Sequence, residues 1–410
     1  MGSNAMKRVL FVDDEENLLN GLKHMLHRMR SSWDMHFATG GQQALLLMEA
    51  EQGFDVVVSD LHMPGMHGAE FLRHVCEKFP EMIRIVLSAN LSAESLTEAA
   101  SVAHQILAKP CDPDHLRNIL ARAFTLCERM ENSTVKTTLM RMGTLPSVPV
   151  LYWRIMEEIN SPEPSVERVA QIISKDPGMT AKVLKLVNVH TADKDRVSNV
   201  MYATHMLGLE NLKSFVLMAE LFENVDEGEL AEGFDLDALW QHGLTVGEYA
   251  RCIAESETTD RRIIDDSYTA GLLHDIGLLI LASKLPAEFD EVLVHARDQG
   301  ITLIQAEKKV LGATHAEIGA YLLDLWGLAD DIVKSISHHF FPSGDPDEMY
   351  TVEEEENFTP LTAVHVANYF CEEEATTEEY GKAELDMIYL EGLELDDRVG
   401  HWWDLCRMAQ

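Results

Sequence analysis

The first 125 residues alternate short runs of apolar, β-branched residues with longer stretches in which apolar positions recur every three or four residues. The short runs predict strands, and the longer stretches predict amphipathic helices. Regular alternation of strand and helix is typical of a doubly wound parallel sheet. The predicted strands are residues 8–12, 34–38, 54–59, 83–87 and 104–108.

The remainder of the chain has helical periodicity almost throughout. In residues 112–142 the apolar spacing predicts either the last helix of the first domain extended as a rod, or a helical seam that pairs two chains in a homodimer. Packing of this helix on its own domain accounts for the pattern only through about residue 124. Two prolines in TLPSVPV then interrupt the periodicity, and residues 151–223 are again nearly all helical. Helices at residues 361–372 and 383–408 are predicted to close the chain.

Reactive polar residues stand where four of the predicted strands end. They are Asp13 and Asp14 after RVLFV, Asp60 after VVVS, Ser88 after IRIVL, and Lys109 after HQILA. Functional residues at the carboxyl ends of parallel strands share one edge of the sheet. The three aspartates would form an oxygen-rich, negative pocket suited to Mg²⁺. Phosphoryl transfer to a carboxylate requires such a cation together with fixed positive donors.

This set of residues resembles the receiver domain of bacterial two-component response regulators, over residues 6 to about 125. The resemblance implies a flavodoxin-like α/β fold in which Asp60 accepts a phosphoryl group from a sensor histidine kinase or a phosphotransfer protein. The receiver would catalyse this reaction on itself. The Mg²⁺ ligands would be Asp13, Asp14, Asp60 and the backbone carbonyl of His62.

In the same family, the lysine at the position of Lys109 neutralises one phosphoryl oxygen, and the hydroxyl at the position of Ser88 contacts another phosphoryl oxygen. Three positions before that lysine, many receivers carry an aromatic residue that turns inward on phosphorylation. Here this residue is Ile106, so the aromatic half of the switch is missing. Ile106 takes no part in the chemistry, and we expect phosphorylation to be retained.

The helical region resembles the HDOD output domain of such regulators. The matching features are the proline pair Pro146 and Pro149, the turn Asp176 and Pro177, Asn188, and the turn Leu207 and Gly208. Val189 and His190 depart from the small residues usual there. The expected organisation is an expression scar at 1–5, the receiver at 6–125, a helical linker at 126–145, an HDOD domain at 146–342, and an acidic loop with closing helices at 343–410.

Histidines and one aspartate follow in the order used by metal phosphohydrolases of the HD superfamily, so the all-α domain is expected to be HD-like. They are His242, His274, Asp275, His315, and His338 or His339. Imidazole and carboxylate ligands suit Fe, Mn, Zn or Ni. Each histidine taken alone is equally compatible with an ordinary buried or capping role.

Three departures predict a degenerate site. Asn368 stands where the enzymes carry a final metal-binding aspartate, and an amide does not supply the charge that balances a metal-bound hydroxide. Leu278 replaces the lysine that follows HDIG in cyclic di-GMP phosphodiesterases, and their GYP signature is absent. We therefore expect at most a single transition metal and no enzymatic activity of the output domain.

Composition limits the partners that we expect. Lys and Arg number 33 against 69 Asp and Glu, and the net charge of -36 would repel phosphate backbones, so DNA binding is not expected. Six cysteines lack any CxxC pair, which favours a reducing cytoplasm. No uninterrupted apolar run is long enough to predict a membrane span.

The combined prediction is a response regulator in a phosphorelay. Phosphorylation of Asp60 would control an HDOD module that acts in protein interaction or ligand sensing, through a downstream protein or small ligand that the sequence does not identify. The alternative is a receiver-controlled, metal-dependent phosphohydrolase, such as a cyclic di-GMP phosphodiesterase.

Overall fold

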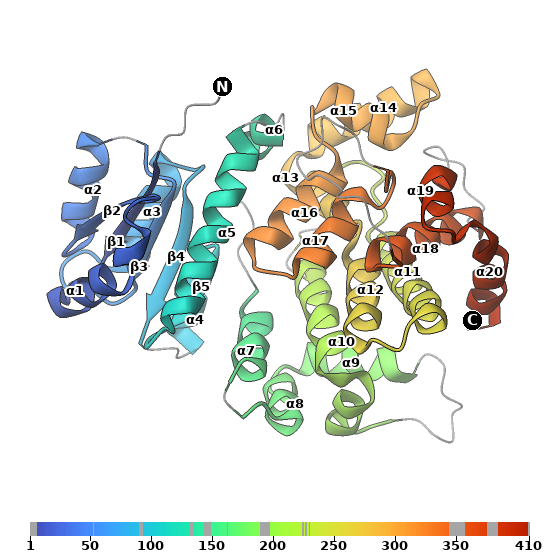
Figure 1. Ribbon diagram of the computed structural model, residues 1–410, viewed down its shortest axis with the longest axis horizontal. Helices are drawn as coiled ribbons and strands as arrows, with labels where there is room; N and C mark the ends of the chain where they lie inside the picture. The colour runs from blue at the N-terminus through green and yellow to red at the C-terminus, as the bar shows by residue number, and fades with distance from the viewer. Residues whose placement is uncertain are drawn as a thin grey trace. The chain divides into compact units, whose positions relative to one another are not determined.

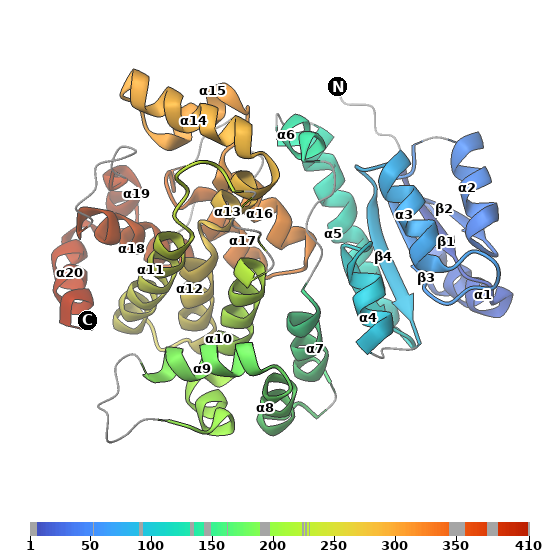
Figure 2. The same ribbon diagram turned by 180° about the vertical axis from the view of Figure 1, so that it is seen from behind.

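The computed structural model describes the chain apart from residues 1–5, 52, 90–92, 132–134, 143–148, 162, 189–196, 224, 226–227, 229, 344–356, 375–383 and 409–410 (Figures 1 and 2). The predicted scar, Pro146, Val189, His190 and most of the acidic loop lie outside the described residues, as do the side chain of Asn188 and most of the junction after residue 142. The chain forms two compact units and passes from the first to the second between Val150 and Leu151.

The first unit is built on a parallel sheet of five strands in the order β2-β1-β3-β4-β5. The strands are β1 (Lys7–Val12), β2 (Trp33–Ala38), β3 (Val56–Asp60), β4 (Ile83–Ser88) and β5 (Gln105–Ala108). Every residue of β3 and β4 is buried, as expected for inner strands covered on both faces. The strand order is that of a doubly wound, flavodoxin-like sheet, which confirms the predicted fold class.

The helices of this unit are α1 (Glu16–Met25), the 3-10 helix η1 (His27–Met29), α2 (Gly41–Ala50), α3 (Gly68–Lys78), α4 (Ala93–Ala100), α5 (Pro113–Glu131) and α6 (Val135–Arg141). Leu116, Leu120 and Phe124 of α5 are buried, and the Phe124 ring lies 5.2 Å from that of Trp33 on β2. These apolar positions therefore belong to the core of the first unit and are not free to pair two chains. The dimer alternative stays a prediction for the residues beyond them.

The second unit is helical in its described residues, which confirms the second part of the predicted fold class. Its helices are α7 (Val150–Ile159), α8 (Val166–Ser174), α9 (Pro177–Asn188), α10 (Val200–Glu223), α11 (Leu236–Glu257), α12 (Arg261–Leu273), α13 (Ile276–Lys284), α14 (Pro286–Gln299), α15 (Leu303–Val310), α16 (His315–Leu325), α17 (Asp330–His338), α18 (Pro360–Glu374), α19 (Met387–Gly392), the 3-10 helix η4 (Asp396–Arg398) and α20 (Val399–Met408). Gly208, in the predicted turn, kinks α10 with a φ of 75°.

The predicted helix at residues 383–408 is wrong, because α19 ends at Gly392 and α20 begins at Val399. Between them Glu394 has a φ of 59°, in the left-handed region that ends helices. The amide of Leu395 then donates to the carbonyl of Leu390 and closes the turn, at 2.9 Å.

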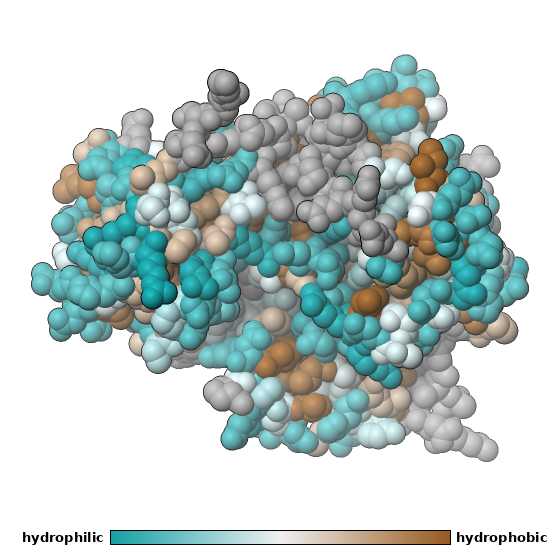
Figure 3. All heavy atoms as spheres, in the orientation of Figure 1, coloured by the Kyte–Doolittle hydropathy of each residue, from teal (hydrophilic) through white to brown (hydrophobic). Residues whose placement is uncertain are grey.

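In the part of the chain that the structure describes, no single helix is long and apolar enough to cross a membrane, although the bent pair of Arg261–Lys284 and Pro286–Gln299 passes by length and composition. Hydrophilic residues cover most of the face seen in Figure 3, with hydrophobic residues in separate patches.

Helices α13 and α16 approach each other closely at Gly277. A Cβ atom built on Gly277 would lie 2.7 Å from the carbonyl carbon of His315, and 3.0 Å from the amide nitrogen of Gly319. Both neighbours are backbone atoms, which do not turn aside as a side chain would. Glycine at this position is therefore what allows the two helices to meet.

We predict that Gly277→Ala lowers the free energy of unfolding of the second unit by about 1–3 kcal/mol, because the methyl group forces α13 from α16. Gly400→Ala is the matched control. No atom lies within 4 Å of a Cβ built on Gly400, and alanine should leave stability unchanged or raise it by up to about 1 kcal/mol. Urea unfolding followed by circular dichroism compares the two variants, and equal losses would refute the packing argument.

Candidate phosphoryl acceptor site and histidine cluster

At the carboxyl edge of the sheet, three aspartates converge on one lysine. Asp13, Asp14 and Asp60 each offer a carboxylate oxygen, and these oxygens all lie within 4.8 Å of one another. The Nζ atom of Lys109 lies 2.6 Å from Oδ2 of Asp13 and 2.9 Å from Oδ1 of Asp60. The structure thus brings together four residues from the ends of three different strands.

The three carboxylates at this edge of the sheet outnumber the single ammonium group of Lys109. Burial lowers the pKa of Lys109, but hydrogen bonds to Asp13 and Asp60 outweigh burial and raise the pKa above its ordinary value. Lys109 is therefore cationic at neutral pH and balances only one of three carboxylates. A set of carboxylate oxygens with uncompensated charge is the donor set that Mg²⁺ prefers, so the residues present fit that cation.

The other predicted residues of this edge lie in different surroundings. Ser88 is buried at the end of β4, where its carbonyl accepts from the amide of Lys109 at 2.9 Å. The side chain of His62 is exposed, with Nε2 3.4 Å from the hydroxyl of Ser95 on α4. Ile106 is buried on β5. The metal role of the His62 carbonyl and the phosphoryl contact of Ser88 stay predictions.

Gly68 is a residue at this edge that the sequence analysis missed. It begins α3, and a Cβ atom on it would collide with the carbonyl of Asp60 and lie 2.7 Å from Cα of Leu61. The Gly68 amide donates to the Leu61 carbonyl at 2.8 Å. The glycine therefore lets α3 start directly against the backbone of Asp60. Its position eight residues after Asp60 carries no signal of this contact.

In the second unit, Asp275 lies between two pairs of histidines. It occupies the junction where α12 ends and α13 begins, next to His274. Its Oδ2 atom lies 3.2 Å from Nε2 of His274 and 3.5 Å from Nε2 of His242 on α11. Its Oδ1 atom lies 3.2 Å from Nε2 of His315, the first residue of α16, and 3.6 Å from Nε2 of His339.

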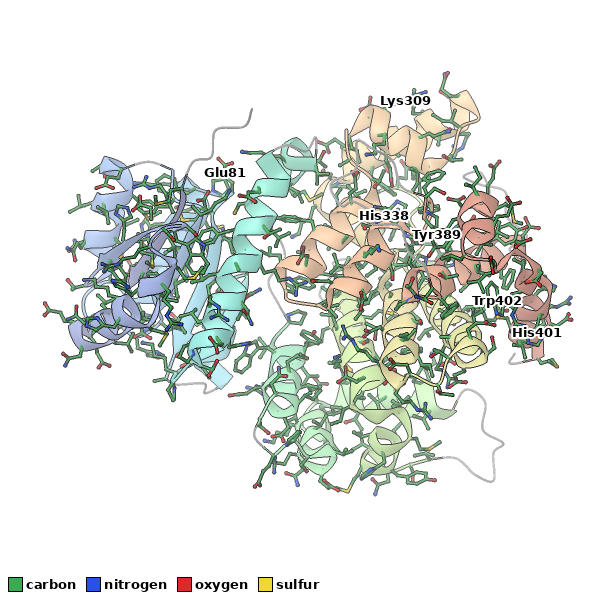
Figure 4. The ribbon with its side chains drawn as sticks, viewed as in Figure 1. Glu81, Lys309, His338, Tyr389, His401 and Trp402 are labelled. Atoms are coloured by element: carbon green, nitrogen blue, oxygen red, sulfur yellow. The ribbon has the colours of Figure 1, made fainter. Side chains whose placement is uncertain are left out.

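The structure separates the adjacent His338 and His339. Both are buried at the end of α17, and Figure 4 labels His338 there. The Nδ1 atom of His338 lies 2.5 Å from the hydroxyl of Ser337 and 3.2 Å from the carbonyl of Lys334. His339 approaches Asp275. Two sets of side chains around Asp275 could hold a metal, namely His242 with His274 and Asp275, and Asp275 with His315 and His339, and His338 belongs to neither set. Of the two alternatives, His339 is the residue in the cluster.

Asn368 and Cys371 of α18 lie on the side of His242. Asn368 is buried, its Nδ2 donates to Oε1 of Glu372 at 3.3 Å, and its Oδ1 has no hydrogen-bond partner. The thiol of Cys371 lies 3.3 Å from Nδ1 of His242. Cys371 has no signal in the sequence, because a single cysteine without a neighbouring ligand pattern points to no particular site.

Glu307 of α15 is the main residue of this cluster that sequence reasoning missed. Its side chain is fully buried, and both carboxylate oxygens lie 2.9 Å from Nδ1 of His315. The backbone amide of His315 also donates to it, at 2.9 Å. In the opposite direction, Lys308 of α15 pairs with Glu317 of α16 at 3.0 Å. Two carboxylates therefore join α15 to the start of α16.

The buried charges shift the pKa values of the cluster in different directions. Burial lowers the pKa of His242 to about 4, and burial likewise lowers that of His339 well below its ordinary value. For His315, burial acts downward, but Glu307 and Asp275 outweigh it and raise the pKa to about 10. Burial acts upward on Asp275, yet His274 and His315 hold its pKa well below the ordinary range. Asp275 is thus an anion at neutral pH.

Three atoms that face one another are buried without a hydrogen-bond partner. They are Oδ1 of Asp275, Nε2 of His315 and Nε2 of His339. Buried polar atoms are nearly always paired, and an unpaired one costs on the order of 1–3 kcal/mol. Imidazole nitrogen and carboxylate oxygen are common ligands of transition metals, so this donor set fits such an ion.

Family comparisons identify both parts of the chain. The model of the response regulator receiver domain matches residues 9–121, and the model of the HDOD domain matches residues 145–342. The two matches do not overlap, and they follow the order of the α/β unit and the helical unit.

Curated relatives match parts of the chain. An uncharacterized protein of Treponema pallidum is 28% identical over 216 residues, which are 49% of this chain and 39% of that protein. The hydrogenase transcriptional regulatory protein HoxA of Cupriavidus necator is 32% identical over 123 residues, which are 30% of this chain and 25% of that protein. The chain thus spans less than half the length of either relative.

Two solved structures resemble the two units separately. An HDOD domain protein of unknown function from Geobacter sulfurreducens is 24% identical, with a TM-score of 0.49, and the match covers 64% of this chain and 92% of that one. The signal receiver domain of an HD domain-containing protein from Pseudomonas fluorescens is 29% identical, with a TM-score of 0.28, and the match covers 29% of this chain and 94% of that one.

These relatives correct one expectation. HoxA is named a transcriptional regulatory protein, and so is ZraR of Escherichia coli, which is 28% identical over 185 residues, 45% of this chain and 40% of that protein. Such names do not fit the expectation of no DNA partner, which therefore does not stand. That expectation rested on the net charge of -36, a sum over the whole chain that does not describe any local surface.

The family matches establish the domain composition of the chain, which is a response regulator receiver domain followed by an HDOD domain.

Proposed function

We propose that this chain is a response regulator whose phosphorylation on Asp60 controls the HDOD domain, which acts in protein interaction or ligand sensing. The observation that carries the proposal is the placement of the Lys109 ammonium between Asp13 and Asp60, at 2.6 and 2.9 Å. A phosphodonor such as a sensor histidine kinase or a phosphotransfer protein would supply the phosphoryl group. A cytoplasmic location would give access to these donors.

In this proposal Mg²⁺ would be held by Asp13, Asp14, Asp60 and the carbonyl of His62, and it would neutralise charge on the transferring phosphoryl group. The carboxylate of Asp60 attacks the phosphorus atom of the donor, and the bond between phosphorus and the donor breaks. Lys109, already 2.9 Å from Asp60, donates to an oxygen of the new acyl phosphate. The hydroxyl of Ser88 follows a second oxygen.

We predict that Asp60→Asn abolishes phosphorylation by acetyl phosphate in the presence of Mg²⁺, since the amide is not a nucleophile. The matched control is Asp114→Asn, which changes an exposed aspartate on α5 and should be labelled as fully as the unmodified chain. Intact-protein mass spectrometry under neutral conditions measures the added phosphoryl group. Full labelling of the Asp60→Asn chain would place the acceptor elsewhere and refute the assignment.

We predict that Lys109→Met slows labelling by on the order of 100-fold, because the donor that meets the new phosphoryl charge is lost. Its affinity for Mg²⁺ should be retained or increased, since a cation leaves the aspartate pocket. Lys78→Met, which removes a lysine paired with Glu49 on the surface of the same unit, should change neither property. Calorimetric Mg²⁺ titration and labelling rates test this. Weaker Mg²⁺ binding in Lys109→Met alone would argue against the proposed charge balance.

A metal-dependent phosphohydrolase is the second candidate, and the unpaired nitrogens of His315 and His339 favour it. We propose instead that the HDOD domain binds at most one transition metal and holds it weakly. Asn368 supplies no negative charge near His242, where a second metal would need it. A single ion bound by three protein ligands is chemically reasonable.

We predict that the purified chain, loaded with Mn²⁺, does not turn over cyclic di-GMP above background, and that dialysis removes its transition metal. Chromatography of the nucleotide products and elemental analysis measure the two properties. The His274→Ala variant is the control for any residual activity. Robust hydrolysis by the unmodified chain, lost in His274→Ala, would make the phosphohydrolase the better assignment.

A further inference from the structure

We infer that Phe341, Met387 and Ile388 form a docking surface for a basic, amphipathic helix of a partner protein. These three side chains are called the apolar platform below. The inference deepens the proposed function, because it rests on the proposal that the HDOD domain acts in protein interaction, and it names the chemistry of the partner. The family match ends at residue 342, so Met387 and Ile388 lie beyond the matched region.

The apolar platform is open to solvent. Ile388 is 79% exposed, Phe341 is 49% exposed and Met387 is 41% exposed. On the same helix, α19, Tyr389 and Leu390 are buried. Helix α19 therefore packs on the unit with one apolar face and presents a second apolar face outward. In Figure 3, hydrophobic residues stand at the position that α19 occupies in Figure 1, beside hydrophilic ones.

Hydrogen bonds around Asp386 bring the parts of the apolar platform together. The amide of Ser343, two residues after Phe341, donates to Oδ2 of Asp386 at 3.0 Å. The other carboxylate oxygen of Asp386, Oδ1, accepts from the amide of Tyr389 at 3.1 Å and so caps α19. Phe341 is thereby held near the start of the helix that carries the other two residues. Adjoining exposed apolar residues mark interaction sites, whereas single ones do not.

The apolar platform rests on a fixed base. The hydroxyl oxygens of Tyr389, which Figure 4 labels, and of Thr362 on α18 lie 2.9 Å apart. The backbone amide of Asp386 donates to Nε2 of His365 at 2.9 Å, and Nδ1 of His365 donates to the carbonyl of His339 at 2.7 Å. A surface that is already ordered loses little conformational freedom when a partner binds. These bonds also connect the platform to the backbone of a residue in the histidine cluster.

The segment that contains the apolar platform is strongly acidic. Residues 335–397 contain 18 aspartates and glutamates against one lysine and no arginine. Less than a sixth of the chain therefore carries 17 of its 36 net negative charges. Glu391 follows Met387 and Ile388 by one helical turn, so it lies on their side of α19. The exposed acidic residues on or next to α19 and η4 are Glu384, Glu391, Glu394, Asp396 and Asp397.

This charge selects the class of partner. At this surface, acidic side chains repel the phosphate groups of nucleic acids and of anionic lipids, and they attract lysine and arginine. The described residues of the helical unit form no strand, so a peptide has no sheet edge there to extend. An amphipathic helix presents apolar anchors on one face and basic residues beside them, which matches an apolar platform with an acidic border.

The test is a titration of the full chain with a fluorescent synthetic peptide of about four helical turns, with leucines at helical spacing and lysines elsewhere. Fluorescence anisotropy measures its affinity. Ile388→Ser should weaken binding by about 10-fold, because an apolar anchor is lost, and Met387→Ser tests the neighbouring anchor independently. The matched control is Met408→Ser, since Met408 on α20 is 76% exposed outside the platform, and the affinity should stay within about 2-fold.

A second pair of variants tests the acidic border. Glu391→Gln combined with Asp396→Asn should weaken binding and reduce its dependence on salt, because charges at the border of an interface act at long range. Glu70→Gln combined with Glu77→Gln removes the same charge from exposed positions on α3 of the receiver and should change neither property. Thermal melting of each variant shows whether the fold is retained.

Three results would overturn the inference. They are equal affinity for a scrambled peptide of the same composition, equal losses in Ile388→Ser and Met408→Ser, and no binding of the amphipathic peptide to the parent chain. Labelling of Asp60 by acetyl phosphate is a separate measurement. A parent chain that is labelled but does not bind the peptide keeps the proposed phosphorylation and loses the docking surface, and a chain that binds the peptide without labelling does the reverse.

Discussion

The buried carboxylate of Asp275 is the charge on which the arrangement of the HDOD domain depends. An ionised carboxylate in a protein interior is costly unless charges and hydrogen bonds surround it. Here the four histidines around Asp275 come from α11, α16 and the ends of α12 and α17, so satisfying one anion fixes the relative positions of four helices. Gly277 makes this possible, because it lets α13 and α16 approach until Asp275 and His315 meet.

The receiver also brings several carboxylates together, but one of them is open to solvent. Asp13 and Asp60 lie at strand ends, where Asp14 is open to solvent, and a single lysine is shared between two of the three carboxylates. The pocket is therefore only partly neutralised. Such partial compensation suits a site that must accept more negative charge along with a cation, whereas the enclosed cluster around Asp275 suits a site of fixed geometry.

The sequence predicted the features that depend on local pattern. Apolar runs located the five strands, and the chemistry of strand ends located Asp60 and Lys109. It did not predict which of two adjacent histidines enters the cluster, because His338 and His339 differ only in the direction in which the helix presents them. Glu307 was missed because a glutamate before two lysines on an amphipathic helix looks like a solvated residue. Close backbone contacts at Gly68 and Gly277, and the left-handed Glu394, depend on tertiary packing and leave no periodic signal.

The reciprocal ion pairs between α15 and α16 have a mechanical consequence. Glu307 accepts a hydrogen bond from His315, and Lys308 forms an ion pair with Glu317. Helix α14 lies beside α15 in both ribbon views (Figures 1 and 2). The orientation of one imidazole is thus set by α15, a helix that supplies none of the four histidines around Asp275. Any displacement of α15 relative to α16 would therefore also displace the carboxylate that holds the His315 ring.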